Sequence, residues 1–410
     1  MKITIVHAHW NNRGDEAALR ALIDEVVAKY PGAEINVYVL VRDVKQFPYS
    51  EPNIHFFNMH YPKRKNKLDY WLSCISKGKI AIFKNSKEFI KMVKGSDLVL
   101  HAPGGPSIGD IYFNNEEKYL LRLNLIRKMG IRYAFYAPSM GPFKSENAGR
   151  NKLRKKVLEG AEFIYLREGQ SAEYVKEFGV KDKEIKVSLD SAFQHYGDEE
   201  VYGRQLAEYT DLQNFLNSYD KVVGMTTTDL KWHPVHGQNP ELKDNIKKSF
   251  DEMIDYLGKK GIGVLFVPQL FGEHHDMKYM KSFAGENCFV MDETHDCYFQ
   301  QYVIGKLYAV IGMRYHSNIF SAKMGTPFVS VAYEQKMSGF MEISGLSDYC
   351  IPIKNLSAKA LIDKFEKLEN NYSDYKNILA QKKEEWVKKS HLTTDEVFEV
   401  LDRGLKSEHK

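Results

Sequence analysis

The stretch of sequence that decides the fold runs from Leu307 to Val331 and reads LYAVIGMRYHSNIFSAKMGTPFVSV. Its two apolar runs, Leu307–Ile311 and Phe328–Val331, are typical of short buried strands, and the residues between them are numerous enough for a helix. Parallel strands need a crossover of this length, whereas antiparallel strands can be joined by a tight turn. The pattern therefore indicates two parallel strands joined by a helix.

The same alternation runs through the rest of the chain. Expected strands are Ile3–Val6, Ile35–Val41, Asp97–Leu100, Tyr133–Tyr136, Phe163–Leu166, Lys221–Met225, Gly263–Val267 and Cys288–Met291. Amphipathic, helix-length segments separate them, and only residues 43–80 look irregular, apart from a helix expected near Tyr70–Ile75. We therefore expect an α/β protein with two doubly wound, Rossmann-like domains.

The polar segment Gly197–Tyr202 separates the two series of strands, so the domains join near residues 188–202. We expect an N-terminal domain over residues 1–195, a C-terminal domain over 196–356, and a helical tail over 357–410 that packs on both. Ligands of such sheets bind beyond the carboxyl ends of the strands, and here also in a cleft between the domains.

Composition excludes several classes of protein. Of the 410 residues 43% are apolar and 27% charged, which excludes a disordered chain, and 58 basic against 54 acidic residues give no reason to expect nucleic acid as a partner. No apolar run approaches the roughly 20 residues of a membrane span. Four scattered cysteines without a CxxC pair argue against structural zinc and a disulfide framework.

The expected location is the cytoplasm, because the N-terminus MKITIVHAHW reads as a first strand and not as a signal peptide. One locally basic cluster, Lys63–Lys67, is either a solvated loop or a contact with an anionic membrane surface.

Arg314 and His316 give the strongest chemical signal. They follow the strand Leu307–Ile311 directly, at the start of the next helix. The backbone N–H groups of a helix N-terminus can bind an anion, and Arg314 and His316 would add a cation and a titratable imidazole to such a site. The alternative is structural: Arg314 caps a neighbouring helix and His316 is a hydrogen-bonded core residue.

The residues that follow make this signal more specific. After R-x-H come a helix of small residues, Gly325-Thr326-Pro327, an apolar strand, and Tyr333-Glu334-Gln335-Lys336-Met337-Ser338-Gly339-Phe340. Further motifs stand in order upstream: Asn12-Arg13-Gly14-Asp15-Glu16-Ala17, Gly104-Gly105-Pro106-Ser107 with Asp110, and Arg167-Glu168-Gly169-Gln170-Ser171. Over most of residues 1–345 the chain resembles the polysaccharide pyruvyltransferase family, although Pro106 replaces a third glycine usual in that family.

The resemblance implies a fold like that of the two-domain glycosyltransferase B type. It also implies transfer of the enolpyruvyl carbons of phosphoenolpyruvate to two hydroxyls of a sugar, which forms a pyruvate ketal. The acceptor would be a nucleotide- or lipid-linked saccharide of a cell-surface polysaccharide, and phosphoenolpyruvate would be a co-substrate with no further cofactor. The oligomeric state and a peripheral membrane contact stay open.

Phosphoenolpyruvate carries a phosphate and a carboxylate, so its site needs several cations. Arg167, Arg314 and Lys336 follow expected strand ends and are the candidates for donor binding. His316 suits the proton transfers, with Asp110 as a second catalytic candidate.

Candidates for acceptor binding are Asp15, Gly104, Gly105, Trp232 and His233. Three of them also have a structural interpretation: Asp15 as a helix cap, and residues 229–238, which hold Trp232 and His233, as an ordinary surface loop.

Histidines at 7 and 9, at 233 and 236, and at 274 and 275 beside Asp276 lack the spacing of a known metal site, so we expect no metal. Two other functions compete with pyruvyl transfer. One is a nucleotide-sugar-dependent glycosyltransferase or epimerase of the same architecture, and the other is a catalytically silent scaffold of the cell envelope.

Overall fold

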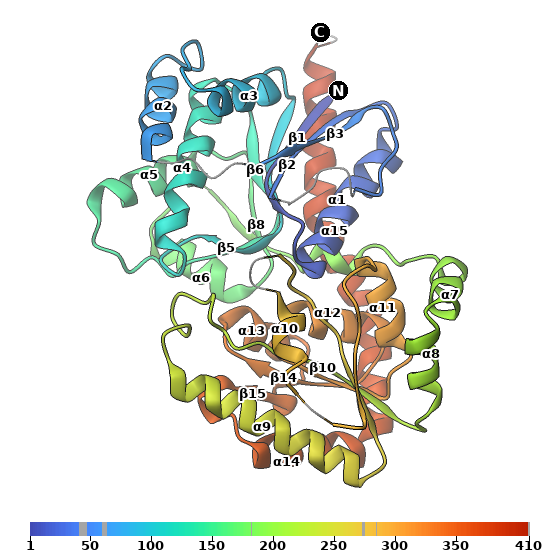
Figure 1. Cartoon of the computed structure of the whole chain (residues 1–410). Coiled ribbons are helices and arrows are strands. Elements are labelled where there is room, and N and C mark those ends of the chain that lie inside the picture. Colours follow the sequence, from blue (N-terminus) through green and yellow to red (C-terminus); the bar gives the residue numbers. More distant parts are fainter. Residues whose placement is uncertain (41–46, 60–63, 182, 273–274, 284, 409–410) are drawn as a thin grey trace. The chain divides into compact units, whose positions relative to one another are not determined.

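The computed structural model describes the whole chain except residues 41–46, 60–63, 182, 273–274, 284 and 409–410. Its contacts define two units (Figure 1). Unit 1 comprises residues 1–11, 18–191 and 389–410, and unit 2 comprises residues 12–17 and 192–388. The sequence predicts a boundary between residues 195 and 196 and a separate tail. In the structure the tail helix α15 (Tyr372–Glu408) belongs to both units, and the motif that begins at Asn12 belongs to unit 2.

Unit 1 contains a seven-stranded parallel sheet in the order β3-β2-β1-β4-β6-β8-β9. Its strands are β1 (Lys2–His9), β2 (Glu34–Leu40), β3 (Ile54–Asn58), β4 (Leu98–His101), β6 (Tyr133–Phe135), β8 (Ile164–Leu166) and β9 (Ile185–Val187). The helices are α1 (Arg13–Lys29), α2 (Arg64–Ile75), α3 (Lys84–Val93), α4 (Phe113–Lys128), α5 (Ala148–Glu159) and α6 (Gly169–Glu177). The strand order reverses between β1 and β4, which is where ligands bind in sheets of this kind.

Unit 2 repeats this architecture with a six-stranded parallel sheet in the order β12-β11-β10-β13-β14-β15. The strands are β10 (Val222–Thr226), β11 (Gly263–Phe266), β12 (Cys288–Val290), β13 (Ala309–Gly312), β14 (Phe328–Ala332) and β15 (Cys350–Pro352). Around them lie α7 (Glu199–Glu208), α8 (Thr210–Asn217), α9 (Pro240–Lys259), α10 (Asp276–Met280), α11 (Cys297–Gly305), α12 (Tyr315–Met324), α13 (Gln335–Ile343) and α14 (Ala358–Asn370). Here the order reverses between β10 and β13.

The predicted fold class is confirmed, and each predicted strand is present with ends that agree to within three residues. Three short edge strands, β3, β9 and β15, were not predicted. In β3 only Ile54 is buried, so the strand lacks the apolar run that marks the central strands. Two further short strands were also not predicted: Gly104–Ile108 forms β5, which pairs with β7 (Pro138–Met140).

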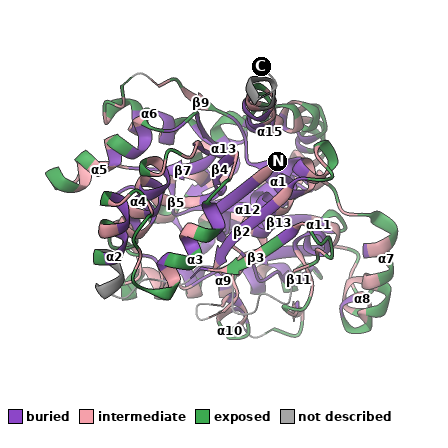
Figure 2. Ribbon diagram, turned by 90° about the horizontal axis from the view of Figure 1, so that it is seen from above, coloured by how far each residue is buried: buried purple, intermediate pink, exposed green. Residues whose placement is uncertain are grey.

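Burial follows this layering (Figure 2). The central strands β1, β4, β10 and β13 are buried along most of their length, and exposed residues lie on the outward faces of helices such as α7 and α8. Helix α12 is an exception, because its residues Tyr315–Lys323 are all buried. Gly325 ends this helix in the left-handed conformation at φ 70°.

A buried ion network fixes the loop after β5 in unit 1. The Glu116 carboxylate accepts hydrogen bonds from Arg154 Nε at 2.8 Å, from Arg150 Nη1 at 2.8 Å and from the Gly109 N–H at 2.9 Å. Arg154 also donates to Asp110 Oδ1 at 2.7 Å. Because these groups are removed from water, each charge depends on its partners.

Replacing Glu116 by Ala leaves two arginines without this carboxylate. We expect the free energy of unfolding to fall by about 3–5 kcal/mol, measured by urea denaturation. Asp363→Ala, which removes an exposed ion pair with Lys359, is the control and should change it by less than about 0.5 kcal/mol. Equal effects of the two substitutions would contradict the assignment of a stabilising network.

Candidate functional site

The carboxyl ends of the central strands in unit 2 gather most of the residues predicted from the sequence. Arg314 and His316 follow β13, one of the two strands between which the order reverses, and Lys336 follows the neighbouring strand β14. Each segment opens a helix, α12 after β13 and α13 after β14. The N–H groups of two helix N-termini therefore lie at the same edge of the sheet as the cations.

The turn before α12 is anchored on β10. The Thr226 hydroxyl accepts hydrogen bonds from the N–H groups of Met313 and Arg314 at 3.1 and 3.2 Å, and it lies 2.7 Å from the Ser317 hydroxyl. Ser317 in turn donates to the Arg314 carbonyl at 2.7 Å. The backbone that presents Arg314 is thus fixed by buried hydroxyls.

The Arg314 guanidinium is buried and forms a two-pronged ion pair with Asp276. Its Nε donates to Asp276 Oδ2 at 3.1 Å and its Nη2 to Oδ1. Burial alone would lower the pKa of Arg314, but the Asp276 carboxylate more than compensates and raises it. Arg314 is therefore a permanent, precisely oriented cation.

A second buried carboxylate, Glu334, joins two of the predicted residues. It lies 2.5 Å from Lys336 Nζ through Oε2 and 3.0 Å from His233 Nε2 through Oε1. Burial opposes the charge of Glu334, yet Lys336 and the hydrogen bond from His233 hold its pKa well below the usual value. The Lys336 ammonium also lies 5.8 Å from the centre of the Tyr315 ring.

The segment with Trp232 and His233 packs on this cluster. His233 Nδ1 accepts hydrogen bonds from the N–H groups of Val235 and His236, both at 3.2 Å, which assigns the proton to Nε2 and makes it the donor to Glu334. The Trp232 ring lies 5.0 Å from the Arg314 guanidinium. His233 is buried and Trp232 half-buried, so neither side chain is simply solvent-exposed, and their role toward an acceptor stays a prediction.

His316 lies against the N-terminus of α1. A Cβ atom at Gly14 would stand 1.8 Å from both Cγ and Nδ1 of His316, so only glycine fits there. On its other side the His316 ring meets Tyr315 edge to face at 4.9 Å between ring centres. The sequence feature that could have indicated this contact is Gly14, a glycine in the motif Asn12–Glu16 where the first strand leads into the first helix.

The same motif contributes a further cation, Arg13, which was not among the predicted site residues. Its Nη1 donates to Glu16 at 2.6 Å, its Nη2 to the Glu293 carbonyl at 3.0 Å, and its guanidinium lies 4.4 Å from the centre of the Phe271 ring. The Arg13 N–H donates to the Gln269 carbonyl at 2.9 Å. These contacts hold the start of α1 on unit 2.

The interpretation of Asp15 as the helix cap is wrong. The Asn12 side chain caps α1, because its Oδ1 accepts hydrogen bonds from the N–H groups of Gly14 at 2.8 Å and Asp15 at 3.4 Å. Asp15 stands in the first helical turn, where an acidic residue is favourable, and its role toward an acceptor stays a prediction.

Arg167 and Asp110, both in unit 1, have well-defined partners. Arg167 is buried and donates to Asp190 at 2.7 Å and to the Ser139 hydroxyl at 2.9 Å. Asp110 accepts from the N–H groups of Lys144 and Ser145 in addition to Arg154. These contacts favour a structural role for Asp110. The expectation that Arg167 binds the donor together with Arg314 and Lys336 stays a prediction.

The point in unit 1 where the strand order reverses carries a group of histidines that the sequence did not single out as a site. His101 Nδ1 lies 2.9 Å from the Ala102 carbonyl, so it carries the proton, and Nε2 accepts from the Ser107 hydroxyl at 3.0 Å. The His7 ring packs between His101 and Tyr119 at 5.0 and 4.6 Å between ring centres. Gly104 and Gly105 lie between His101 and Ser107 in the sequence. Because His101 and Ser107 are hydrogen-bonded to each other, the two glycines also lie at this edge of the sheet.

The local backbone at this edge is unusual. His7 adopts the left-handed conformation, with φ 66°, at an irregularity in the pairing of β1 with β2. Non-glycine residues in this conformation store strain and cluster at functional sites. Burial lowers the pKa of His101 to about 4, and burial together with His101 lowers that of His7 well below the usual value.

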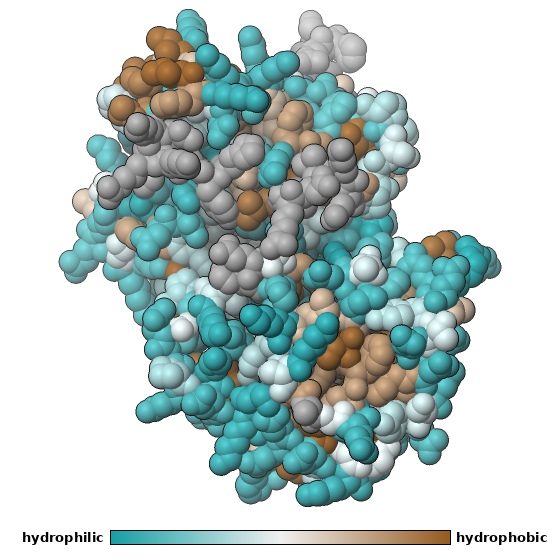
Figure 3. Space-filling model, viewed as in Figure 1, coloured by the Kyte–Doolittle hydropathy of each residue, from teal (hydrophilic) through white to brown (hydrophobic). Residues whose placement is uncertain are grey.

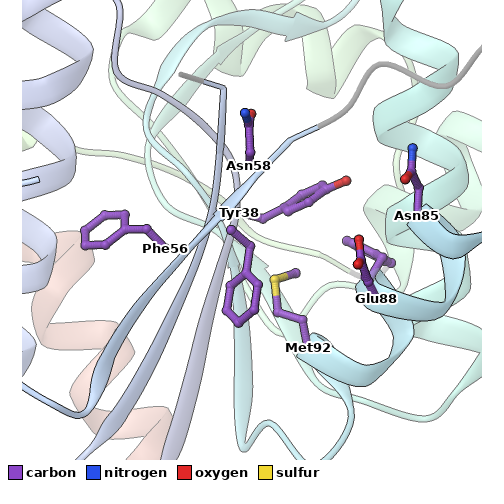
Figure 4. Close-up of a pocket in the computed structure, with 8 residues that line it drawn as sticks. Tyr38, Phe56, Asn58, Asn85, Glu88 and Met92 are labelled. Carbon is purple, nitrogen blue, oxygen red and sulfur yellow. The ribbon is translucent and has the colours of Figure 1, made fainter. Parts of the chain in front are cut away.

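A separate cavity of about 210 Å³ lies between strands β2 and β3 and helix α3 (Figure 4). Its lining includes the rings of Tyr38 and Phe57, the amides of Asn58 and Asn85, and the Glu88 carboxylate. None of the residues predicted from the sequence lines this cavity.

Comparisons with known proteins identify the family. The family model for polysaccharide pyruvyl transferase matches residues 12–335. This chain belongs to that family. The matched range begins at the Asn12 motif that packs on His316, and it ends at Gln335, beside Glu334 and Lys336. A relative of this chain is the amylovoran biosynthesis protein AmsJ of Erwinia amylovora. The two are 24% identical over 93% of this chain and 95% of AmsJ.

Solved structures confirm the glycosyltransferase-B-like fold. The chain is similar to UDP-GlcNAc 2-epimerase from Neisseria meningitidis, with a TM-score of 0.58, 11% identity, and coverage of 97% of this chain and 100% of that one. It is also similar to sucrose-phosphate synthase from Thermosynechococcus elongatus, with a TM-score of 0.59, 12% identity, and coverage of 98% and 99%. At this level of identity the likeness concerns the fold alone.

Two further observations apply to the described part of the chain. It holds no cluster of three or more His, Cys, Asp or Glu residues arranged for a metal ion, and no helix within it is long and apolar enough to span a membrane. Lys63, His274 and the side chains of residues 64–67 lie outside the described residues, so the predicted basic cluster and the His274–His275 pair cannot be placed.

The contact between Gly14 and His316 predicts a non-additive pair of substitutions. Gly14→Ala should lower the free energy of unfolding by about 1–3 kcal/mol, because the new methyl group overlaps the imidazole, and the loss should largely vanish when His316 is also Ala. The matched control is Gly149→Ala in the first turn of α5, where a Cβ would meet nothing closer than 3.6 Å. Additive effects of Gly14→Ala and His316→Ala in denaturation experiments would contradict the contact.

The lowered pKa of His101 predicts that the protein loses stability as the pH decreases. Between about pH 6.5 and about pH 4 the unfolded chain binds a proton at this position and the folded chain does not, so unfolding is favoured as the pH drops. We expect His101 to contribute a slope of up to about 1.4 kcal/mol per pH unit in this window. His101→Gln should reduce the slope of unfolding free energy against pH, and an unchanged slope would contradict the assignment.

Proposed function

We propose that this member of the family transfers the enolpyruvyl carbons of phosphoenolpyruvate to two hydroxyls of a saccharide in a polysaccharide pathway, forming a pyruvate ketal. The observation that carries the proposal is the set of groups at the reversal point of unit 2. There Arg314, His316 and Lys336 stand at the N-termini of two helices. The name of the relative AmsJ supports a role in polysaccharide biosynthesis.

The charged groups of the proposed donor site suit an anionic donor. Each cation of the cluster is paired with a buried carboxylate: Arg314 with Asp276, Lys336 with Glu334, and Arg13 with Glu16. These pairs hold the cations in fixed orientations but also offset their charge. The starts of α12 and α13 then add backbone N–H groups and the positive ends of two helix dipoles. The phosphate and the carboxylate of phosphoenolpyruvate match a site that offers both cationic side chains and backbone N–H groups.

The chemistry requires two proton movements. One acceptor hydroxyl adds to C2 of phosphoenolpyruvate while its proton goes to the methylene carbon, which becomes a methyl group. The second hydroxyl then replaces phosphate at C2, and its proton leaves with the phosphate. We assign the first transfer to His316, because an imidazole can accept from the hydroxyl and donate to carbon.

We place the acceptor at the reversal point of unit 1, where Gly104 and Gly105 follow β4 and the Ser107 hydroxyl is held by His101. Trp232, His233 and Asp15 stay candidates from unit 2. The proposal needs no metal, because cations and N–H groups are available to hold the phosphate. It places the reaction in the cytoplasm, where phosphoenolpyruvate is produced.

Thermal unfolding with phosphoenolpyruvate tests the donor assignment. At 100 times its dissociation constant the donor should stabilise the protein by about 2.7 kcal/mol, seen as a rise in Tm, and a chelator should leave the rise unchanged. Arg314→Lys should weaken binding, because a point charge cannot replace the guanidinium fork. A rise in Tm with a UDP-sugar and none with phosphoenolpyruvate would contradict the proposal in favour of a nucleotide-sugar enzyme.

His316→Gln separates binding from chemistry in the same experiment. It should keep most of the donor-induced rise in Tm while lowering the catalytic constant by about 10²–10⁴, since glutamine can donate a hydrogen bond but cannot titrate near neutral pH. In cells, ketal-linked pyruvate in the surface polysaccharide reports this loss. Normal pyruvate content with His316→Gln would show that His316 only positions the donor.

A further inference from the structure

Exposed apolar side chains are concentrated in one short segment of unit 1. Half of the twelve large apolar side chains that the described part of the chain exposes lie within residues 68–83: Leu68, Trp71, Ile75, Ile80, Ile82 and Phe83. All but Phe83 are more than half exposed. Figure 3 shows this apolar surface over α2 and the segment that leads to α3, and we refer to these six residues as the apolar patch.

The patch is built and held in place. On α2, Leu68, Trp71 and Ile75 are spaced by three and four residues and so share one face of the helix. The buried Asp69 carboxylate accepts hydrogen bonds from the N–H groups of Ile82 and Phe83 at 2.8 and 3.0 Å. A buried carboxylate is thus used to fix the backbone of a loop whose apolar side chains face water.

Two hydroxyl groups, one near the end of α2 and one directly after it, hold the other end of the same loop. The Ser73 hydroxyl donates to the Ile80 carbonyl at 2.9 Å, and the Ser76 hydroxyl accepts from the Ile80 N–H at 3.0 Å. Exposing this much apolar surface costs free energy, and contiguous exposed patches mark interaction sites. An ordered loop that keeps such side chains exposed therefore indicates a partner.

Charge identifies the kind of partner. Residues 68–94 hold six lysines against two carboxylates, Asp69 and Glu88, although the whole chain has an excess of only four positive charges. All six lysines are exposed, and three of them, Lys84, Lys87 and Lys91, lie along one face of α3 opposite its buried side chains. The Asp69 carboxylate is buried and accepts hydrogen bonds from the loop, so it does not offset the lysines. The surface around the patch is therefore strongly basic.

We propose that the apolar patch and the lysines beside it bind the surface of an anionic lipid bilayer. An apolar face with tryptophan, bordered by lysines, matches both layers of such a surface: the patch enters the headgroup–acyl boundary and the ammonium groups meet the phosphates. Helix α2, with 12 residues, is too short to span a bilayer and would lie in its plane.

A second copy of this chain fits the surface less well. A two-fold symmetric contact through the patch would bring the same lysines of both copies together, and like charges repel across an interface. The inference does not depend on pyruvyl transfer. It would, however, bring the enzyme to a lipid-linked acceptor.

Co-sedimentation of the full chain with lipid vesicles tests the proposal. We expect binding to vesicles of phosphatidylglycerol and phosphatidylcholine in equal amounts, weaker binding at high salt, and little binding to phosphatidylcholine alone. Trp71→Ser together with Ile75→Ser should lower the partition coefficient at least about tenfold. Leu392→Ser, which removes an exposed leucine from α15, is the control and should leave binding unchanged.

Charge reversal tests the second half of the surface. Lys79→Glu together with Lys87→Glu should lower binding to the anionic vesicles by about 25-fold or more at low salt, whereas Lys388→Glu on α15 should not. All variants should keep the wild-type melting temperature and its response to phosphoenolpyruvate, which separates this result from the donor site.

Three results would overturn the proposal: no binding to either kind of vesicle, equal binding by wild type and the patch variants, or a concentration-dependent dimer that the patch substitutions convert to monomer. The last would assign the patch to an interface between two copies.

Discussion

The ion pair between Arg314 and Asp276 is the interaction on which the rest of the site in unit 2 depends. A buried guanidinium is stable only with a partner, and Asp276 supplies both carboxylate oxygens to it. Asp276 Oδ2 also accepts hydrogen bonds from the N–H groups of Gln269 and Leu270 at 3.1 and 2.9 Å. One carboxylate therefore ties the loop after β11 to the start of α12.

This link extends to the N-terminus of α1. The Gln269 carbonyl accepts the Arg13 N–H, and the next residue, Gly14, is the one against which His316 packs. Loosening Asp276 would thus disturb three features at once: the orientation of Arg314, the loop after β11, and the support of the His316 ring. The position of the chemical groups is set by this chain of contacts and not by either helix alone.

Much of the fold and the centre of the site could be predicted from the sequence, because buried parallel strands are apolar runs and the residues after them gather at one edge. Arg314, His316 and Lys336 were found in this way. Their partners could not be found, since Asp276 stands 38 residues before Arg314 and nothing local marks it as a partner. Gly14 and Arg13 lie within the predicted N-terminal domain, whereas their contacts group them with unit 2, because contact across about 300 residues leaves no periodic signal.

The apolar patch illustrates another limit of sequence patterns. Residues 43–80 look irregular because apolar residues alternate with lysines and serines without a regular period. The hydrogen bonds of Asp69, Ser73 and Ser76 show that the part from residue 69 onward is nevertheless held in place. Conversely, Asp110 looked like a catalytic carboxylate by its place after a strand. Its contacts with two backbone N–H groups and Arg154 favour a structural role.

The central claim is that the donor binds at the starts of α12 and α13 beside the N-terminus of α1. Hydrogen–deuterium exchange with and without phosphoenolpyruvate tests it most directly, because the exchange of each segment is read separately. The account predicts that phosphoenolpyruvate slows exchange in residues 12–16, 313–318 and 334–339 and leaves residues 68–83 unchanged. Unchanged exchange in residues 313–318 and 334–339 at a saturating concentration would contradict it.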